Sequence, residues 1–165
     1  MKQVSQKKFS GDITYKLEIT GLTHEGQGVG KIDGFVVFVD SALPGETVTV
    51  KIVKETKSYA VGKLVGVDKP SKDRAIPFCP VFDKCGGCAV QHMSYQAQLD
   101  FKKDTVLQNI RRIGGLEKVK VLDTIGMANP FKYRNKVQYP VSMVDNQIKI
   151  GFYESRSHNI IDSTQ

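Results

Sequence analysis

All three cysteines of this 165-residue chain lie in one short stretch, which makes them the first candidates for chemistry. Five residues separate Cys79 from Cys85, and Gly86 and Gly87 separate Cys85 from Cys88. Two thiolates at this short spacing can bind one metal ion or one edge of a cluster, and the glycines let backbone amides turn toward sulfur. The spacing therefore indicates a metal site but does not select the metal.

Three assignments of these thiols stay open on spacing alone. An iron–sulfur cluster uses four thiolates, one more than this stretch supplies. A structural zinc site also needs four ligands, and His92 supplies the fourth. A disulfide between Cys85 and Cys88 requires oxidation, and a catalytic thiol is disfavoured because clustered cysteines usually share a metal. Spacing alone therefore ranks zinc slightly ahead of a cluster.

The composition is typical of a cytoplasmic globular protein. Apolar residues make up 40% of the chain, enough for a core. No apolar run approaches the roughly eighteen residues that a membrane helix needs, and the charged N-terminus lacks the apolar segment of a secretory signal. We therefore expect no membrane association, and no protein partner is evident.

The net charge of +7 indicates a polyanionic partner, most simply nucleic acid. The excess of Lys and Arg over Asp and Glu is similar in residues 1–67, 68–125 and 126–165. An excess spread in this way fits a composite binding surface better than a single basic tail.

Residues 1–67 show the pattern of a small β-barrel, and we expect the polar residues 1–8 to be frayed. Tyr15, Leu17 and Ile19 alternate with charged residues, as in a half-buried strand. Further strands are expected at 35–39, around 48–52 and at 60–67, with a type II turn at 43–46. About five short strands without a helix favour a five-stranded barrel of the oligonucleotide-binding (OB) type.

Two motifs in this region, at 21–30 (GLTHEGQGVG) and 42–46 (ALPGE), make it similar to a TRAM domain. The resemblance covers most of residues 10–67 and implies contact with RNA. Lysines would neutralise phosphates and exposed aromatic rings would lie against bases. The candidates for these contacts are Lys31, Lys51, Lys54, Lys57 and Tyr59.

Residues 68–74 are polar and contain a proline, so we expect a linker between two domains. Residues 75–165 then form a small α+β central domain. Ser94 is a suitable N-cap for a helix that ends at Gly114 and Gly115. We expect the helix to pack its apolar stripe under the cysteine loop and the following sheet; the stripe comprises Leu99, Val106, Ile110 and Ile113.

The sequence after the helix indicates strands. A short strand is expected at 119–122, and 133–139 alternates well enough for another. Pro140 indicates a sheet edge or a bulge. Asp145 and Asn146 indicate a turn, and we expect the partner strand at 147–153. The expected fold is therefore mainly β with one long helix.

The stretch from Cys79 through His92 and Met93, followed by Tyr95 and Gln98, resembles the S-adenosylmethionine-dependent RNA (uracil-5-)-methyltransferase family. The order of barrel, cysteine loop, helix and Tyr-Arg-Asn segment matches over nearly all of the chain. The resemblance implies that this chain is the N-terminal portion only. The S-adenosylmethionine site and the catalytic cysteine would belong to a downstream domain, so no catalytic residue is expected here.

In that family the three cysteines help to hold a [4Fe-4S] cluster. The resemblance implies that Cys79, Cys85 and Cys88 are three of its ligands and that the fourth lies beyond Gln165, in a central domain that is truncated here. We therefore expect the cluster to be lost or replaced by zinc in this chain. The matching segment of Arg134, Asn135 and Lys136 would lie near the RNA substrate, and the planar guanidinium of an arginine can hold a phosphate or a base edge.

The expected function is to bind rRNA or tRNA and position it for methyl transfer to uridine C5 by a downstream domain. This chain alone should be inactive. The alternative is a self-standing RNA-binding protein with a structural zinc site. Iron with inorganic sulfide in the purified protein would favour the first, and stoichiometric zinc the second.

Overall fold

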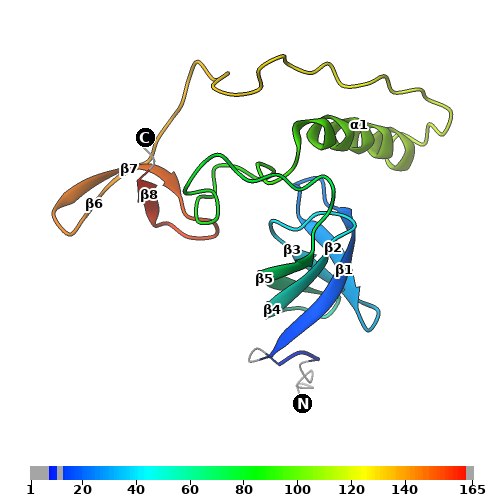
Figure 1. Ribbon diagram of the computed structural model, residues 1–165, viewed down its shortest axis with the longest axis horizontal. Coiled ribbons are helices and arrows are strands. Elements are labelled where there is room, and N and C mark those ends of the chain that lie inside the picture. Colours follow the sequence, from blue (N-terminus) through cyan, green and yellow to red (C-terminus); the bar gives the residue numbers. More distant parts are fainter. Residues whose placement is uncertain (1–7, 11–12, 163–165) are drawn as a thin grey trace. The chain divides into compact units, whose positions relative to one another are not determined.

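The structure is a computed structural model that describes residues 8–10 and 13–162. The chain divides into two compact units, the first ending at Arg74 and the second beginning at Ala75, and each is described by itself (Figure 1). The described residues are mainly β with one long helix, as the sequence predicted. No helix among them is long and apolar enough to cross a membrane.

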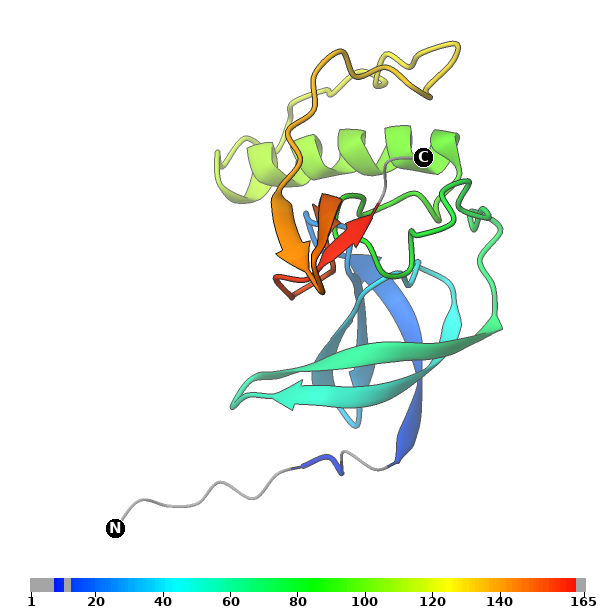
Figure 2. The ribbon, with the colours of Figure 1, turned by 90° about the vertical axis from the view of Figure 1, so that its left-hand side faces the viewer.

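The first unit is a closed barrel of five strands, which confirms the predicted fold (Figure 1). The strands are β1 (Thr14–Leu22), β2 (Gly28–Ile32), β3 (Phe35–Val39), β4 (Thr47–Glu55) and β5 (Tyr59–Lys69). Their order around the barrel is β1-β2-β3-β5-β4. The β3–β5 pair is parallel and the other pairs are antiparallel; β4 and β5 form a long pair (Figure 2).

The core of the barrel follows from the alternation of its strands. Leu17 and Ile19 of β1 point inward while Lys16 and Glu18 are exposed, as predicted. Gly28 and Gly30 of β2 leave room for the neighbouring strand, because a Cβ at Gly30 would collide with the carbonyl oxygen of Glu18. The remaining buried apolar side chains of this core are Phe9, Ile32, Val37, Val39, Ala42, Val48, Val50, Ile52 and Ala60.

The turn before β4 also has its predicted form. Gly45 has φ +82, as the third position of a type II turn requires, and the Glu46 amide donates to the Leu43 carbonyl at 3.2 Å. The Glu46 carboxylate is fully buried and accepts from the amides of Leu43 and Ser71 and from the Arg74 guanidinium. Residues 68–74, expected as a linker, are thus held against the barrel.

At the other end of the chain, the expected fraying of residues 1–8 lies outside the described residues except at Lys8. The backbone amides of Lys8 and Phe9 donate to the Glu55 carboxylate at 2.8 and 3.1 Å. These bonds fix the Lys8 backbone at the end of β4.

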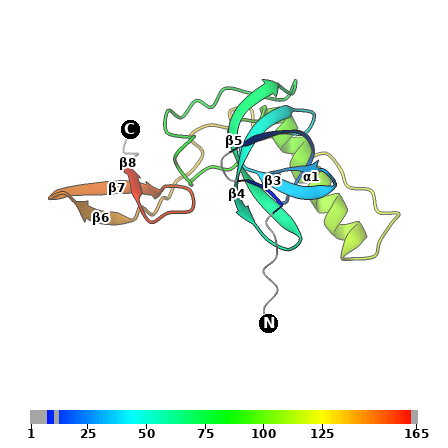
Figure 3. The same cartoon turned by 90° about the horizontal axis from the view of Figure 1, so that it is seen from below.

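The second unit contains α1 (Tyr95–Arg112), β6 (Val141–Val144), β7 (Gln147–Tyr153) and β8 (Ile160–Asp162). The three strands form one antiparallel sheet in the order β6-β7-β8 (Figure 3). Ser94 caps α1 as predicted, its hydroxyl accepting from the Ala97 amide at 3.3 Å. The helix ends where expected, with Gly115 at φ +66.

The apolar stripe of α1 does not pack as predicted, because no residue of the helix is buried. Ile113, just after the helix, is 83% exposed. The chain after the helix bonds to it instead: Thr124 donates to the Leu99 carbonyl at 2.9 Å, and the Met127 amide donates to the Tyr95 hydroxyl at 2.7 Å. Residues 119–122, expected as a strand, form none.

The strand expected at 133–139 is also wrong, and the hairpin turn explains why. Asp145 and Asn146 both have positive φ, at +51 and +59, the geometry of a two-residue hairpin turn. This turn pairs Val144 with Gln147, so β6 runs back only to Val141. Pro140 precedes it and has no amide to donate, so the ladder ends there.

Candidate functional site

The cysteine loop, residues 75–93, is closed by hydrogen bonds at both ends. The Ala75 amide donates to the His92 carbonyl at 2.8 Å, and the Cys79 amide donates to Oε1 of Gln91 at 3.1 Å. Within it, the Cys85 amide donates to the Val81 carbonyl at 2.8 Å. These bonds bring the start and end of the loop together, so Cys79 and Cys88 lie in one small region although nine positions separate them.

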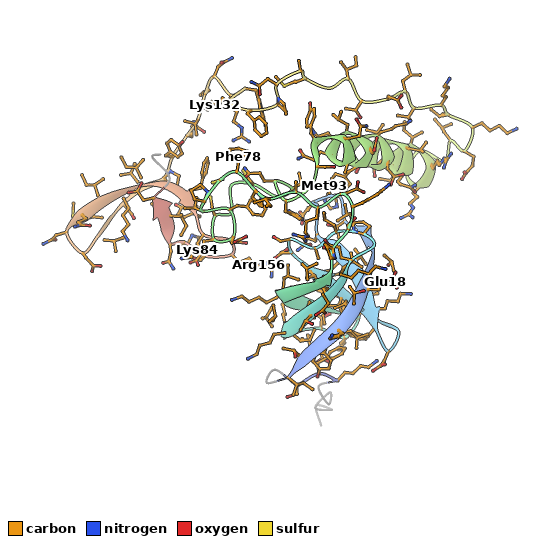
Figure 4. The ribbon with its side chains drawn as sticks, viewed as in Figure 1. Glu18, Phe78, Lys84, Met93, Lys132 and Arg156 are labelled. Carbon is orange, nitrogen blue, oxygen red and sulfur yellow. The ribbon has the colours of Figure 1, made fainter. Side chains whose placement is uncertain are left out.

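The corner between β7 and β8 supports this loop. Cys85 forms an isolated antiparallel bridge with Glu154, and the Gly86 amide donates to the Tyr153 carbonyl at 2.8 Å. The Ser155 amide donates to the Lys84 carbonyl at 3.1 Å, and Figure 4 shows Lys84 close to Arg156 at this corner. The sheet therefore fixes the position of Cys85.

Gly86 and Gly87 allow close contact with the strand β7 and its corner, and neither has a positive φ. A Cβ on Gly86 would lie 3.0 Å from the Tyr153 carbonyl oxygen, and one on Gly87 would lie 3.1 Å from the Phe152 ring. The Gly87 amide does point at sulfur, since it donates to Sγ of Cys85 at 3.4 Å.

Cys79 and Cys85 lie close enough to Cys88 to affect its thiol. Partial burial raises the pKa of the Cys88 thiol, the thiolates of Cys85 and Cys79 raise it further, and the positive charge of Arg134 lowers it. Nε2 of Gln91 also donates to Sγ of Cys88 at 3.8 Å. The loop therefore gathers three thiols with two N–H donors, and the cation of Arg134, from the segment before β6, lies near them.

A closed metal site is not formed by the residues that the structure describes, among which no three His, Cys, Asp or Glu side chains are placed to hold a metal ion. His92, the fourth zinc ligand of one alternative, is 1% exposed and packs against the Phe82 ring, with centroids 5.6 Å apart. The loop thus carries three free thiols that, in the described residues, are not arranged around one metal position.

The candidates Arg134, Asn135 and Lys136 lie together in the irregular segment before β6, and all three are exposed. Phe131 of this segment stacks edge-to-face on Phe78 of the cysteine loop, with ring centroids 4.9 Å apart. Figure 4 labels Phe78 and Lys132 on the two segments that meet at this junction. Together with the pKa effect of Arg134 on Cys88, this contact places the basic segment beside the cysteine loop.

The remaining RNA candidates lie on the first unit. Lys31 of β2, Lys51 and Lys54 of β4, and Lys57 of the β4–β5 turn are all exposed. Tyr59 is half-buried at the start of β5, and its ring lies 5.4 Å from that of Phe38. Sequence reasoning missed Phe38, because every residue from 35 to 39 is apolar and the alternation is hidden.

Lys63 of β5 was also missed. It is exposed and lies directly opposite Lys51 of β4 in the antiparallel register. The sequence of residues 60–67 marks Lys63 only as the lone charged residue of an expected strand. Its pairing with Lys51 depends on the strand register, which the sequence does not give. The barrel thus holds the predicted lysines and two further residues of suitable chemistry.

Residues 13–65 match the TRAM domain family. An uncharacterized RNA methyltransferase of Clostridium tetani is 49% identical over 161 residues, which are 98% of this chain and 34% of that protein. One from Listeria monocytogenes is 50% identical over 147 residues, covering 89% of this chain and 32% of the relative.

Among solved structures, the Pyrococcus abyssi tRNA (uracil-54, C5)-methyltransferase, in complex with S-adenosyl-L-homocysteine, is similar over 91% of this chain and 31% of its own. The TM-score is 0.60 and the sequence identity 29%. The chain spans about a third of the length of the curated relatives that it matches. This chain is therefore similar to about a third of the length of each of these RNA methyltransferases, and its residues 13–65 match the TRAM domain.

Proposed function

We propose that this chain is the RNA-binding region of a methyltransferase that modifies C5 of uridine in rRNA or tRNA. The observation that carries the proposal is the likeness to the Pyrococcus tRNA (uracil-54, C5)-methyltransferase, which extends over both units of this chain. In this proposal S-adenosylmethionine and the catalytic cysteine belong to a further domain of the complete protein. The chain's own residues bind the RNA and orient it.

Exposed basic residues on both units support a binding role. The barrel presents Lys31, Lys51, Lys54 and Lys57 to solvent, and the second unit presents Arg134 and Lys136. Lysines contact phosphates as point charges, whereas an arginine can also bind a base edge with two parallel hydrogen bonds. The barrel would therefore contribute sequence-independent affinity, and the segment around Arg134 would help to select the nucleotide.

The thiols of Cys79, Cys85 and Cys88 would hold three corners of a [4Fe-4S] cluster, with the fourth ligand supplied by the complete protein after Gln165. The closeness of Cys79 and Cys85 to Cys88, which raises the Cys88 pKa, and the N–H donors to two sulfurs support this assignment. Such a cluster supplies a rigid cross-link. Because Arg134 lies within electrostatic reach of Cys88, the cross-linked loop would help to position the basic segment.

The test compares this chain with the protein encoded by the complete gene. Each is incubated with isotopically labelled S-adenosylmethionine and with rRNA and tRNA transcripts, and the nucleosides are identified by mass spectrometry. We expect 5-methyluridine from the complete protein, and RNA binding without methyl transfer from the chain. Methylation of another base, or any methyl transfer by the chain alone, would contradict the proposal.

Metal content tests the cluster separately. The complete protein, purified without oxygen, should contain about four iron and four sulfide per molecule. A Cys88→Ser variant should lose most of both while its barrel remains folded. Stoichiometric zinc without sulfide would instead favour the self-standing RNA-binding protein with a structural zinc site.

A further inference from the structure

Two aromatic side chains of the barrel point away from its core. In β3, Val37 and Val39 are fully buried, so Phe38 between them faces outward. In β5, Ala60 is fully buried, so Tyr59 before it faces outward. The ring centroids of Phe38 and Tyr59 lie 5.4 Å apart with an interplanar angle of 66°. The barrel thus carries an edge-to-face ring pair on its outer surface.

Lysines of β4 and β5 lie on one side of this ring pair. The register places Phe38 opposite Val61 of β5, and Val61 opposite Lys54 of β4. Lys63 follows Val61 on the same outward face of β5, two residues further along, about 7 Å. These exposed lysines are therefore within one or two side-chain positions of the rings.

Lys51 and Lys63 form an unfavourable pair on their own. They lie directly opposite each other in the β4–β5 register, and like charges in this position destabilise a sheet. Within residues 8–10 and 13–162, neither side chain forms an ion pair. The carboxylate of Asp40, just after β3, accepts from Nε2 of Gln27 at 2.7 Å. A bound anion would relieve the repulsion between the two ammonium groups.

We infer that Phe38, Tyr59, Lys51 and Lys63 form one platform for an unpaired RNA segment. The rings contact bases, and the two lysines neutralise two phosphates of the same strand. A duplex is excluded as the preferred ligand, because its bases are stacked against one another and their faces are closed to the rings. This inference rests on the proposed RNA-binding function and adds the form of RNA that the barrel takes.

Three probes separate the contributions to binding by the whole chain: a 12-nucleotide oligouridine, an abasic strand of the same length, and a duplex hairpin. Phe38→Leu and Tyr59→Leu remove each ring and keep an apolar side chain. Tyr59→Phe keeps the ring and should bind as the wild type does. Val65→Ala, at an exposed position of β5, and Lys16→Ala, at a residue 3.7 Å from Asp68, are the controls.

The ring variants should bind oligouridine about tenfold more weakly and leave binding of the abasic strand unchanged. A Lys51→Ala, Lys63→Ala double variant should weaken binding of both strands and lower the salt slope by about 1.4. Thermal unfolding verifies that each variant is folded. Unchanged oligouridine binding by folded ring variants, or equal losses on the duplex, would overturn the platform alone. Failure of the wild type to bind any RNA, including rRNA and tRNA, would overturn the proposed function as well.

Discussion

Glu46 joins the barrel to the residues that follow it. Its carboxylate is fully buried and lies 2.5 Å from Nε of Arg74, and Nη2 of Arg74 also donates to the Ser41 carbonyl at 2.7 Å. Glu46→Gln keeps the size but removes the charge, so the Arg74 guanidinium loses its counter-ion. We expect the free energy of unfolding to fall by about 2–3 kcal/mol, measured by urea denaturation. Glu18→Gln, at an exposed position of β1, should change it little.

The same carboxylate should make stability depend on pH. Burial alone raises the pKa of Glu46, but the hydrogen bonds from Arg74, Leu43 and Ser71 and the positive charge of Arg74 outweigh it and hold the pKa below the ordinary value of 4.5. The unfolded chain therefore takes up its proton first as the pH falls. The stabilisation by the Glu46 carboxylate is complete above about pH 4.5 and is lost as the pH falls through the pKa of Glu46 in the folded protein.

Urea midpoints at several pH values below 5 check this expectation. The wild type should lose more stability than Glu46→Gln over that range. Parallel curves for the two proteins would show that the carboxylate does not contribute.

Single residues also show where prediction from the sequence ends. The cysteines, the lysines of the barrel and Tyr59 could be selected as candidates by type and spacing. Phe38 and Lys63 could not, because the outward direction of Phe38 and the pairing of Lys63 with Lys51 appear only once the strand register is known. Side-chain chemistry is local, whereas register is a property of two strands.

At the scale of elements, α1 depends on local interactions because no residue of it is buried. Ser94→Ala removes the acceptor of the Ala97 amide and should destabilise the helix by about 1 kcal/mol. Amide hydrogen exchange in the first turns should then become roughly fivefold faster. Ser94→Asp keeps an acceptor and should exchange as slowly as the wild type; equal rates for all three proteins would remove the cap as a determinant.

The success of prediction differed between elements for a physical reason. Most of the barrel strands have alternating residues and turns that set their lengths, so their sequence largely determines them. The segment 133–139 alternates as well but has no partner strand. The turn at Asp145 and Asn146 pairs residues 141–144 with β7 instead. The stripe of α1 likewise identifies the helix but not what covers it. Periodicity predicts a conformation, and tertiary partners decide whether it is used.

At the scale of the whole molecule, the positive charge is shared by the two units. Lys51 belongs to the barrel and Arg134 to the second unit, and both are exposed. If one RNA contacts both units, Lys51→Ala and Arg134→Ala should each lower the salt slope for a full rRNA or tRNA transcript by about 0.7–0.9. The double variant that combines these two changes should lower it by about twice as much. A single basic surface would instead concentrate the effect in one unit.

Titrations of transcript and oligouridine at several salt concentrations distinguish these cases. Arg134→Ala should weaken binding of the transcript. It should leave the affinity for a 12-nucleotide oligouridine unchanged, because we expect so short a strand to contact the barrel platform alone. Lys51→Ala should weaken both. Arg112→Ala, at an exposed position in the last turn of α1, is the matched control for loss of an arginine. Unchanged affinity of Arg134→Ala for the transcript would remove Arg134 from the binding surface and leave the barrel as the site of RNA contact.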